Sequence, residues 1–442
     1  MGNLFFTISG LRGIIGESLT PELVARISAH FGNFSGKGEI IIGEDTRKSS
    51  EMIKSAAISG LLGVGITPVD IGVVPTPTIL FAVREKKAKG GIAVTGSHNP
   101  PEWNALKFIG ENGTFLKEKE IKILKNLLKK KPKYKKSEEI KKVEKEYYIE
   151  KHIKAILNEK IFNIKKIKEK RFNVGIDGAN GAASLAIPLL CEKLNCKVFK
   201  INCDKPGYFE REPEPTANNL DSLRNLVLEK NLDIGFATDA DGDRLVIILK
   251  GGKILSEEHT LPLFIYYMLS KIKEKKPVIT NYSTSRMVDE VAKKFGTSVK
   301  RTKVGEAFVV EKMEKEKAIL GGEGNGGVIY RNINFTRDSL IGVAAILSLL
   351  CEIEDSRDFE KLVPEFFMKK IKIPYKRINF DKFIKILKPK EINMEDGLLL
   401  NFDDGFLHIR KSNTEPIIRV IGEFKENKKT EEIFKKIKNF LK

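Results

Sequence analysis

The sequence predicts a protein built from several α/β domains. Two observations support this prediction: the chain has 442 residues, and apolar runs of strand length alternate along it with stretches of helical periodicity. A chain of this length exceeds what one hydrophobic core usually supports, so we expect several domains of about 100 residues each. Alternating strands and helices are the signature of α/β domains.

The composition is typical of a folded protein in the cytoplasm. Hydrophobic residues make up 41% of the chain and charged residues 31%. No apolar stretch approaches the roughly 18 residues that a membrane helix needs, and the N-terminal residues lack the basic region and cleavage site of a signal peptide. The four cysteines have neither CxxC spacing nor nearby histidines, which is typical of buried thiols in a reducing compartment. We therefore expect a cytoplasmic protein with no membrane partner.

The net charge of +19 raises the question of a nucleic-acid partner. Much of the excess lies near residues 117–170 and 425–442, where lysine alternates with glutamate at helical spacing. This pattern favours solvated amphipathic helices. Aromatic residues are not interleaved there and no nucleic-acid motif occurs, so we expect no nucleic-acid partner. A positive field also suits an anionic small substrate.

Five predicted strands run directly into loops of small and polar residues. The segments are EIIIGEDTR, GGIAVTGSHNP, FNVGIDGANGAA, DIGFATDADGDR and AILGGEGNGG. In open α/β sheets, ligands bind beyond the carboxyl ends of the strands. Each of these loops is therefore a candidate wall of a binding site. The polar side chains that they offer are Asp45, Thr46, Arg47, Ser97, Asp177, Asn180, Asp239, Asp241, Asp243, Glu323 and Asn325.

The segment TDADGDR is a candidate metal site. Asp239, Asp241 and Asp243 alternate, so in an extended segment their carboxylates project to one side and repel one another unless a cation lies among them. Oxygen-only ligands favour Mg²⁺ or Ca²⁺ over zinc. An EF-hand is excluded because Arg244 and Lys250 stand where that loop needs glycine and glutamate. A phosphatase that uses the first aspartate as a nucleophile stays open.

The segment RKSNTEPIIR has the chemistry of a phosphate-binding loop. Arg410 supplies a planar fork of donors, and Ser412 and Thr414 supply hydroxyl groups. Asn413 tolerates a left-handed turn that exposes backbone N–H groups, and Arg419 follows on the next predicted strand. A polar hairpin turn explains the segment alone nearly as well.

The segment GGEGNGG brings its backbone within reach of a ligand because glycines surround two polar residues. Glu323 and Asn325 are its only side chains, and both have the hydrogen-bonding groups to contact sugar hydroxyls. A flexible glycine turn explains this stretch equally well.

Ser97 lies at the predicted tip of the loop TGSHNPPEWNALKF. It has no convincing triad, since the chain has five histidines and no GxSxG elbow, and His98 is its immediate neighbour. A hydroxyl group in a chain that also carries a metal loop and a phosphate-binding loop indicates phosphoryl transfer through Ser97. Lys107 is then a candidate cation or proton carrier.

Five motifs together resemble those of a known family. SGLRG, TGSHNPPEWNALKF, DADGDR, GEGNGG and RKSNTEP occur in the order found in the α-D-phosphohexomutases, which include phosphoglucomutase, phosphomannomutase and phosphoglucosamine mutase. The resemblance covers almost the whole chain. It implies four domains around a central cleft: three related α/β domains with mixed sheets, and a smaller C-terminal α+β domain. We place them at residues 1–155, 156–256, 257–368 and 369–442.

The resemblance also implies roles for individual residues. Ser97 matches the serine that carries the transferable phosphate. Asp239, Asp241 and Asp243 match the Mg²⁺ ligands, with a phosphoserine oxygen completing the site. The residues that match other positions in the cleft are Arg12, His98, Lys107, Arg244 and Lys303. The residues that match the sugar-binding and phosphate-binding loops are Glu323, Asn325, Arg410, Ser412, Asn413, Thr414 and Arg419.

We therefore expect an isomerase that interconverts hexose 6-phosphate and hexose 1-phosphate through a phosphoserine and a 1,6-bisphosphate, which also serves as activator. Asn325 stands where many glucose and mannose enzymes have serine, and Gly327 where many have histidine. The loop looks more like the phosphoglucosamine mutase branch, which favours glucosamine phosphate. Glucose or mannose phosphate is the alternative, followed by a Mg²⁺-dependent sugar phosphatase and a basic nucleic-acid-binding protein. We expect a monomer or a homodimer.

Overall fold

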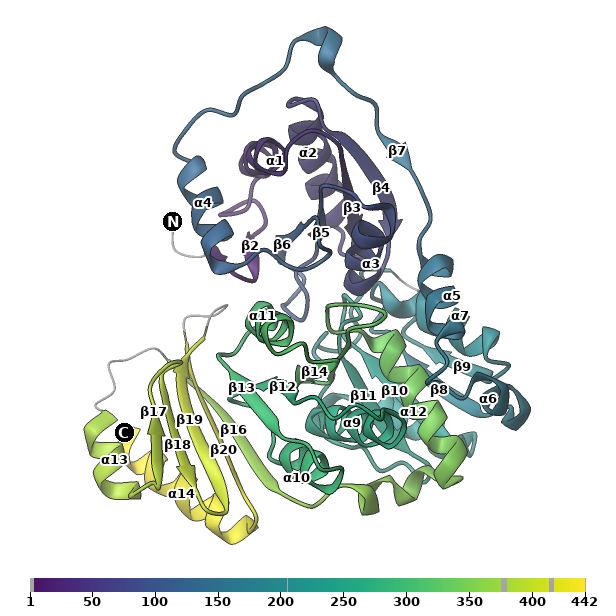
Figure 1. Cartoon of the computed structure of the whole chain (residues 1–442), viewed down its shortest axis with the longest axis vertical. Helices are drawn as coiled ribbons and strands as arrows, with labels where there is room; N and C mark the ends of the chain where they lie inside the picture. The colour runs from purple at the N-terminus through teal and green to yellow at the C-terminus, as the bar shows by residue number, and fades with distance from the viewer. Residues whose placement is uncertain (1–3, 205, 375–379, 413–416, 442) are drawn as a thin grey trace.

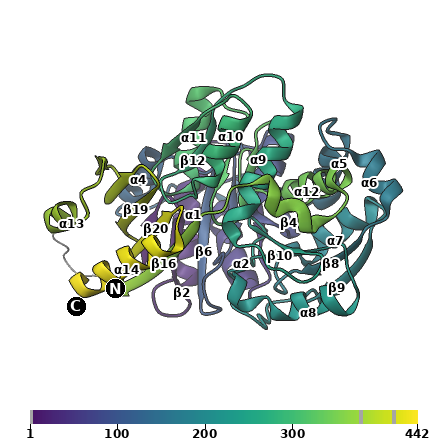
Figure 2. The same ribbon diagram turned by 90° about the horizontal axis from the view of Figure 1, so that it is seen from below.

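The computed structural model describes residues 4–204, 206–374, 380–412 and 417–441, which form four domains, each built on one sheet (Figure 1). Domain I lies at the top of the figure and domains II, III and IV lie below it. Seen from below, domains II and IV lie on opposite sides of domain III (Figure 2). The first three sheets are mixed and the fourth is antiparallel. The predicted fold class is therefore confirmed.

Domain I has a seven-stranded sheet of order β1-β2-β6-β5-β3-β4-β7. Its strands are β1 (Phe5–Thr7), β2 (Gly10–Ile14), β3 (Glu39–Glu44), β4 (Thr67–Val73), β5 (Gly90–Val94), β6 (Trp103–Gly110) and β7 (Glu144–Lys145). Its helices are α1 (Pro21–Ser35), α2 (Ser50–Leu62), α3 (Thr76–Lys86) and α4 (Glu118–Leu127).

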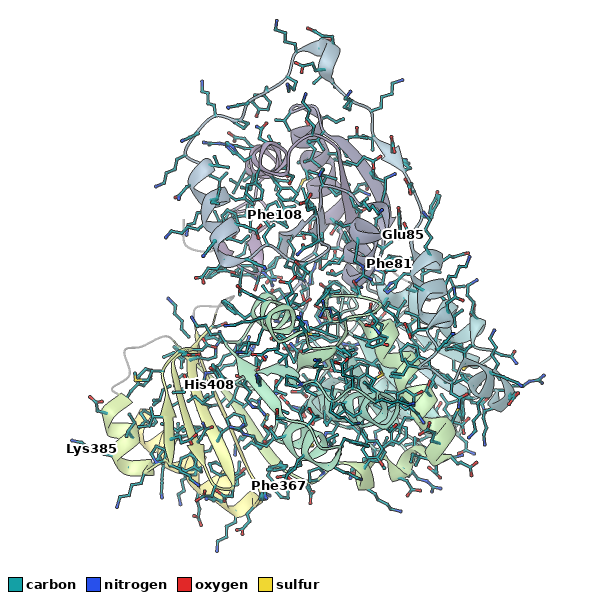
Figure 3. The ribbon with its side chains drawn as sticks, in the orientation of Figure 1. Phe81, Glu85, Phe108, Phe367, Lys385 and His408 are labelled. Atoms are coloured by element: carbon teal, nitrogen blue, oxygen red, sulfur yellow. The ribbon has the colours of Figure 1, made fainter. Side chains whose placement is uncertain are left out.

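The sheet of domain I is covered on both faces. Ile40 and Ile42 of β3 belong to one hydrophobic cluster, whereas Ile41 between them belongs to another, because successive strand residues point to opposite faces. Phe31 of α1 contacts Phe108 in the first cluster with their ring centroids 5.0 Å apart, and Figure 3 shows Phe108 inside this domain. A sheet buried on both faces holds its strand ends, and the loops that follow them, in fixed positions.

Domain II has the sheet order β11-β10-β8-β9 and domain III the order β13-β12-β14-β15. The elements of domain II are α5 (Ile149–Asn158), α6 (Ile164–Lys170), β8 (Asn173–Asp177), α7 (Ala183–Lys193), β9 (Lys197–Ile201), α8 (Asp221–Glu229), β10 (Ile234–Thr238) and β11 (Leu245–Leu249). The elements of domain III are α9 (Thr260–Lys271), β12 (Val278–Asn281), α10 (Met287–Lys294), β13 (Val299–Thr302), α11 (Glu306–Glu316), β14 (Leu320–Glu323), β15 (Gly327–Tyr330) and α12 (Ser339–Ile353).

Domains II and III share one hydrophobic core around α12. This helix has the sequence SLIGVAAILSLLCEI, apolar on all sides, and one cluster joins it to residues of both domains. A helix that is apolar all round is buried all round. Its first turn is capped by Asp338, whose side chain accepts hydrogen bonds from the backbone N–H groups of Leu340 and Ile341.

Domain IV has an antiparallel sheet of order β16-β20-β19-β18-β17. Its elements are β16 (Phe367–Pro374), α13 (Phe380–Leu387), β17 (Glu391–Asn393), β18 (Leu398–Phe402), β19 (Gly405–Lys411), β20 (Ile417–Phe424) and α14 (Asn427–Leu441). It has a core of its own. Polar contacts join it to domain III: Ser283 with His408 at 2.9 Å, and Lys370 with Glu258 at 2.6 Å. His408 is labelled in Figure 3.

The lysine-rich region 117–170 is helical only in part, which corrects the sequence prediction. Helices α4, α5 and α6 form at its ends, but residues 131–148 contain only a one-turn 3₁₀ helix (Ser137–Glu139) and β7 (Figure 1). Pro132 interrupts the run KKKPKYKK, and proline disfavours helix at itself and at the preceding residue. Like charges four residues apart also oppose a helix.

The expectations for the cysteines and for membrane helices can also be compared with the structure. All four cysteines are free thiols, three of them buried and Cys203 partly so. Among the described residues, no helix combines the length and apolar character needed to cross a membrane.

Candidate active site

Residues from all four domains line one cavity of about 350 Å³. Domain I contributes Ser97, domain II Arg244, domain III Glu323 and domain IV Arg410, among others. This volume lies in the range of small-molecule sites. Three of the five strand-end loops singled out in the sequence, those after β5, β10 and β14, meet around this cavity.

Ser97 directly follows β5 and is held in a strained backbone conformation. Its φ is 51°, in the left-handed region, and the residue is 3% exposed. The backbone N–H of Ser97 donates to the hydroxyl oxygen of Thr95 at 2.8 Å. A non-glycine residue in this conformation costs energy and is found mostly at functional sites. Ser97 lines the cavity, and its hydroxyl group lies 3.5 Å from Nδ1 of His98.

Arg47 fixes the position of the Ser97 loop through hydrogen bonds to the backbone of the loop. Its guanidinium donates to the backbone oxygens of Ser97, Asn99 and Pro100, each at 2.6 Å, while its Nε lies 3.1 Å from Oδ2 of Asp45. Arg47 is buried and does not line the cavity. The loop EDTR therefore supports the site rather than forming a wall of it, which corrects the sequence prediction.

The loop in FNVGIDGANGAA is also not a wall of the cavity. Asp177 forms a salt bridge with Arg211 at 2.9 Å, and Asn180 donates to the backbone oxygen of Tyr208 at 2.6 Å. A later segment of domain II thus occupies the space at the end of β8. The residue types at the end of a strand do not show whether another segment of the chain packs against them.

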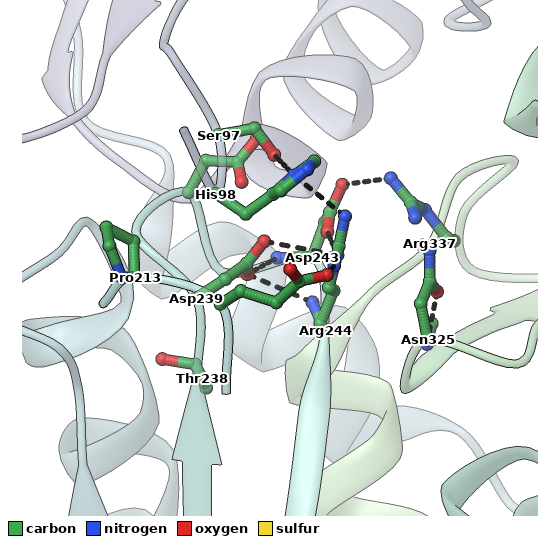
Figure 4. Close-up of polar contacts among 12 residues, drawn as sticks. Ser97, His98, Pro213, Thr238, Asp239, Asp243, Arg244, Asn325 and Arg337 are labelled. Carbon is green, nitrogen blue, oxygen red and sulfur yellow. Dashed lines mark hydrogen bonds and ion pairs between the residues drawn. The ribbon is translucent and has the colours of Figure 1, made fainter. Parts of the chain in front are cut away.

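Asp239, Asp241 and Asp243 form a buried cluster, here called the aspartate loop. All three are 0% exposed, and one ligand oxygen of each lies within 4.8 Å of the others. Their convergence comes from a tight turn rather than an extended segment: Gly242 has a φ of 68°, and Oδ1 of Asp239 accepts from the backbone N–H groups of Asp243 at 3.1 Å and Arg244 at 3.2 Å. Figure 4 shows this turn beneath Ser97 and His98.

Cations from two other domains lie against the aspartate loop. Lys107 Nζ lies 2.7 Å from Oδ2 of Asp241, and Arg337 Nη2 lies 2.5 Å from Oδ2 of Asp243. Burial acts to raise the pKa of Asp241, but Lys107 outweighs it and holds that pKa below its usual value. Burial and repulsion from Asp243 and Asp241 raise the pKa of Asp239 well above its usual value.

The remaining oxygens of the aspartate loop fit a divalent cation. Oδ2 of Asp239, Oδ1 of Asp241 and Oδ1 of Asp243 are buried and have no hydrogen-bond partner. Buried carboxylate oxygens without partners are costly, and three of them from one turn are the oxygen ligands that Mg²⁺ or Ca²⁺ takes. The donor set therefore fits such an ion.

Basic residues surround the Ser97 hydroxyl group. Arg244 donates from Nη2 to Nδ1 of His98 at 2.8 Å and pairs through Nη1 with Glu214 at 2.6 Å (Figure 4). Burial and the charge of Arg244 hold the pKa of His98 well below its usual value, so the imidazole is neutral. Arg12 donates to the backbone oxygen of Gly96 at 3.2 Å. These groups make the surroundings of Ser97 suitable for an anion.

In the segment TKVGEAF, the residue that lines the cavity is Glu306 rather than the expected Lys303. Lys303 is exposed and does not line the cavity. Glu306 of the same segment does, and burial raises its pKa. It accepts from Nε of Arg337 at 3.0 Å.

The sugar-binding loop expected from GGEGNGG faces the same cavity. Oε1 of Glu323 accepts from Nδ2 of Asn281 at 2.7 Å and from the backbone N–H of Gly305 at 3.2 Å. Its Oε2 lies 3.0 Å from Nη1 of Arg337. Asn325 accepts from the backbone N–H of Gly327 at 3.2 Å. Glu323 therefore has its orientation fixed before any ligand binds.

Domain IV presents a row of cations to the cavity. Arg410 on β19 lies directly opposite Arg419 on β20, which lies opposite Lys372 on β16, and all three line the cavity together with Ser412. Asp396 pairs with Nε of Arg410 at 3.1 Å. Like charges directly opposite in a sheet are destabilising, and a bound anion would further reduce their repulsion. Two further predicted residues of this loop, Asn413 and Thr414, lie outside the described residues.

Sequence reasoning missed three residues of this arrangement: Glu214, Glu306 and Arg337. Glu306 lies three residues after the expected Lys303, whereas Glu214 and Arg337 belong to no motif singled out in the sequence. Arg47 was expected as a wall of the site, and its supporting role was not.

Replacing Arg47 with lysine should loosen the Ser97 loop. Lysine keeps the charge but has no planar fork to bond several carbonyl groups. We expect a loss of about 2–4 kcal/mol of unfolding free energy, since buried acceptors lose their partners, and faster hydrogen exchange of the amides of residues 95–103. Chemical denaturation and exchange mass spectrometry measure these effects. The matched control is Arg224→Lys at an exposed position of α8, and equal exchange in both variants would contradict the role of Arg47.

The sequence matches family profiles of known proteins for three of the four domains. The sequence matches the profiles described as "Phosphoglucomutase/phosphomannomutase, alpha/beta/alpha" domain I over residues 3–135, domain II over residues 150–252 and domain III over residues 256–369. The domain boundaries that we placed from the sequence stay predictions.

Two relatives and one solved structure match nearly the whole chain. A phosphoglucomutase/phosphomannomutase of Thermococcus kodakarensis is 35% identical, over 98% of this chain and 97% of its own. A protein named "probable phosphoglucosamine mutase" of Pyrococcus abyssi is 34% identical, over 100% of this chain and 98% of its own. A phosphoglucomutase/phosphomannomutase family protein of Burkholderia thailandensis shares the fold, with a TM-score of 0.82 at 24% identity, covering 99% of this chain and 96% of its own. The chain therefore belongs to the phosphoglucomutase/phosphomannomutase family of α-D-phosphohexomutases.

Proposed function

We propose that this phosphohexomutase interconverts the 6-phosphate and the 1-phosphate of a hexose by way of phospho-Ser97, with glucosamine phosphate as its preferred substrate. The observation that carries the proposal is the single cavity lined by Ser97, by Arg244 directly after the aspartate loop, and by the cation row of domain IV. Ser97 would carry the phosphate, the aspartates would bind a metal ion, and the cation row would bind a second anion. Moving a phosphate between two positions of a sugar phosphate needs all three.

The reaction takes place in two transfers. The free hydroxyl group of a hexose monophosphate attacks the phosphorus of phospho-Ser97, so that a P–O bond to the sugar forms and the bond to Ser97 Oγ breaks. The proton of the sugar hydroxyl ends on Oγ of Ser97, and the product is a hexose 1,6-bisphosphate. After the bisphosphate has reversed its orientation in the cavity, its other phosphate returns to Ser97 and the isomeric monophosphate leaves.

The side chains around Ser97 have distinct tasks in these transfers. Arg12 and Arg244 stabilise the charge of the phosphoryl group, and the ring of His98 accepts from Arg244 through Nδ1, which holds that guanidinium beside Ser97. Lys107, which lines the cavity and bonds Asp241, moves the proton between the sugar hydroxyl and Oγ of Ser97.

The metal cofactor proposed is Mg²⁺. Asp239, Asp241 and Asp243 would hold it through the carboxylate oxygens that have no hydrogen-bond partner, together with an oxygen of phospho-Ser97. When bound, Mg²⁺ neutralises negative charge on the phosphoryl group that is transferred.

Domain IV holds the phosphate that does not react. The substrate binds in two orientations, so this site must accept either phosphate of the same sugar. Arg410, Arg419 and Lys372 suit this task because guanidinium and ammonium groups bind phosphate through charge and several donors rather than through the shape of the sugar. Domain IV has its own core and polar contacts to domain III, an interface of the kind that permits domain motion. We propose that it hinges to admit substrate and release product.

The charges around the sugar-binding loop favour an amino sugar. Arg337 contacts three carboxylates, those of Glu323, Glu306 and Asp243, and Asp243 also lies 3.8 Å from Nε of Arg244. An excess of carboxylates beside the sugar attracts the ammonium group of glucosamine. The name of the relative from Pyrococcus abyssi supports the same sugar. The relative from Thermococcus kodakarensis supports glucose and mannose phosphates as the alternative.

The remaining expectations stay predictions: a monomer or homodimer in the cytoplasm that binds a phosphosugar and a bisphosphate activator, and no nucleic acid. A Mg²⁺-dependent sugar phosphatase is the competing activity. It would release inorganic phosphate without forming the isomeric sugar phosphate, so assays that measure both products separate the two activities.

Ser97→Ala should abolish isomerisation while the fold persists. Alanine removes the oxygen that carries the phosphate and leaves the backbone bonds of Arg47 in place. Intact-mass measurement of the purified wild-type protein should show a fraction that carries one phosphate, and the variant should show none. Ser270→Ala on the surface of α9 is the control. Retention of full mutase activity in Ser97→Ala would refute the mechanism.

Asp241→Asn should weaken Mg²⁺ binding, because one of three negative charges is lost. We expect a fall in affinity of about tenfold or more, as the loss of a charged hydrogen-bond or ion-pair partner typically costs 1.5–3 kcal/mol. Titration calorimetry with Mg²⁺ measures this change, with Asp221→Asn as the control. If protein treated with EDTA keeps its activity without added metal, the assignment of the aspartate loop is wrong.

Glu323→Gln should impair the glucosamine reaction more than the glucose and mannose reactions, since it removes a charge and keeps the shape. In the wild type we expect the highest kcat/KM for glucosamine phosphate, with the other two sugars turned over less well. The assay uses Mg²⁺ and a trace of the matching bisphosphate, and Glu311→Gln on the surface of α11 is the control. An equal fall for all three substrates would mean that Glu323 binds a hydroxyl group that they share.

A further inference from the structure

Arg337 joins the aspartate loop to the sugar-binding loop. It lies immediately before α12, next to the capping residue Asp338. Its three guanidinium nitrogens bond three carboxylates: Nη2 contacts Oδ2 of Asp243 at 2.5 Å, Nη1 contacts Oε2 of Glu323 at 3.0 Å, and Nε contacts Oε2 of Glu306 at 3.0 Å. In Figure 4, Arg337 lies between Asp243 and Asn325 of the sugar-binding loop.

These contacts determine which carboxylate oxygens of Asp243 and Glu323 remain available to a cation or a substrate. Because Arg337 occupies Oδ2 of Asp243, Oδ1 is the oxygen of that side chain without a hydrogen-bond partner; it lies 3.8 Å from Nε of Arg244. Asn281 holds Oε1 of Glu323 and Arg337 holds Oε2. The planar fork of a guanidinium can fix several carboxylates at once, which the point charge of an ammonium cannot.

Gly327 leaves the space through which Arg337 reaches these partners. A Cβ atom at position 327 would lie 2.2 Å from Cδ of Arg337 and 2.7 Å from its Cγ, closer than real contacts allow. The φ of Gly327 is not in the left-handed region, and the residue pairs with Glu323 in a regular antiparallel ladder. The backbone at this position therefore accepts any residue, and only the path of Arg337 requires glycine.

We propose that Arg337, in the space left by Gly327, is a positioning residue that couples cation binding at the aspartate loop to sugar recognition at Glu323. This inference rests on the proposed function, because it names the connection between two parts of the same site. The coupling is physical: a shift of the guanidinium that turns Asp243 also turns Glu323, since one rigid plane bonds both.

The test compares Arg337→Lys, Gly327→Ala and the double variant with the wild type. Lysine keeps the charge and loses the fork, whereas alanine leaves Arg337 in the sequence and displaces its side chain. Gly342→Ala on α12 is the control, because the nearest atoms to its Cβ would be side-chain atoms of Leu245 on β11 and Val328 on β15, and none of Arg337. Two readouts are measured: the Mg²⁺ concentration that gives half of the Mg²⁺-induced rise in Tm, and kcat and KM for glucosamine 6-phosphate at saturating Mg²⁺.

We expect both single variants to need about tenfold more Mg²⁺ and to show a KM about tenfold higher, as for the loss of one charged hydrogen bond. We expect kcat at saturation to stay within about threefold. The double variant should be no worse than either single variant, because both changes break the same contacts. A merely structural role would lower Tm without Mg²⁺ and leave the Mg²⁺ midpoint unchanged.

Additive effects in the double variant, or a Mg²⁺ midpoint unchanged in either single variant, would overturn the inference. If Arg337→Lys does not fold, Gly327→Ala alone decides between these outcomes. A wild-type protein that binds Mg²⁺ but does not isomerise hexose phosphates refutes the proposed function, and the Tm readout then still tests the coupling of Arg337 to the aspartate loop.

Discussion

Three aspartates buried side by side are the constraint on which the arrangement of the first three domains depends. Asp239, Asp241 and Asp243 are shielded from water, and unpaired buried carboxylates are among the most costly features a protein can contain. Their charge is balanced by cations from elsewhere: Lys107 of domain I and Arg337 of domain III. The loop keeps its place only while these domains lie against it, so the charge that prepares a metal site also joins three domains.

Rigidity and mobility are divided among the domains in a way that suits a two-step transfer. The Ser97 loop is held by Arg47 through several backbone oxygens, and domains II and III share one core around α12. These parts hold the reacting groups, for which small displacements are costly in rate. Domain IV has a separate core and a polar interface, and it carries Arg410, Arg419 and Lys372, which we propose bind the phosphate that does not react. A site whose ligand must reverse its orientation within the cavity benefits from having one wall that can move.

Sequence reasoning failed where the neighbours of a residue, rather than its own pattern, decide the structure. The lysine-rich residues 131–148 lie in a region of helical spacing but form neither helix nor strand over most of their length, because a proline interrupts them and β7 pairs with β4. Asp177 follows a buried strand as the other site residues do, yet a segment with Arg211 closes over it. Lys303 matches a motif but points to solvent, while Glu306 lines the cavity.

The sequence by itself determined the α/β class, the strands, and the local chemistry at the ends of β5, β10, β14 and β19, because a strand followed by a turn of small and polar residues is encoded within about ten neighbouring positions. Only the tertiary structure decided which distant side chains complete that chemistry. Lys107 meets Asp241 across 134 positions, and Arg337 meets Asp243 across 94. Such pairs arise from how whole domains pack, and neither periodicity nor spacing in the chain records which buried carboxylate a remote cation will neutralise.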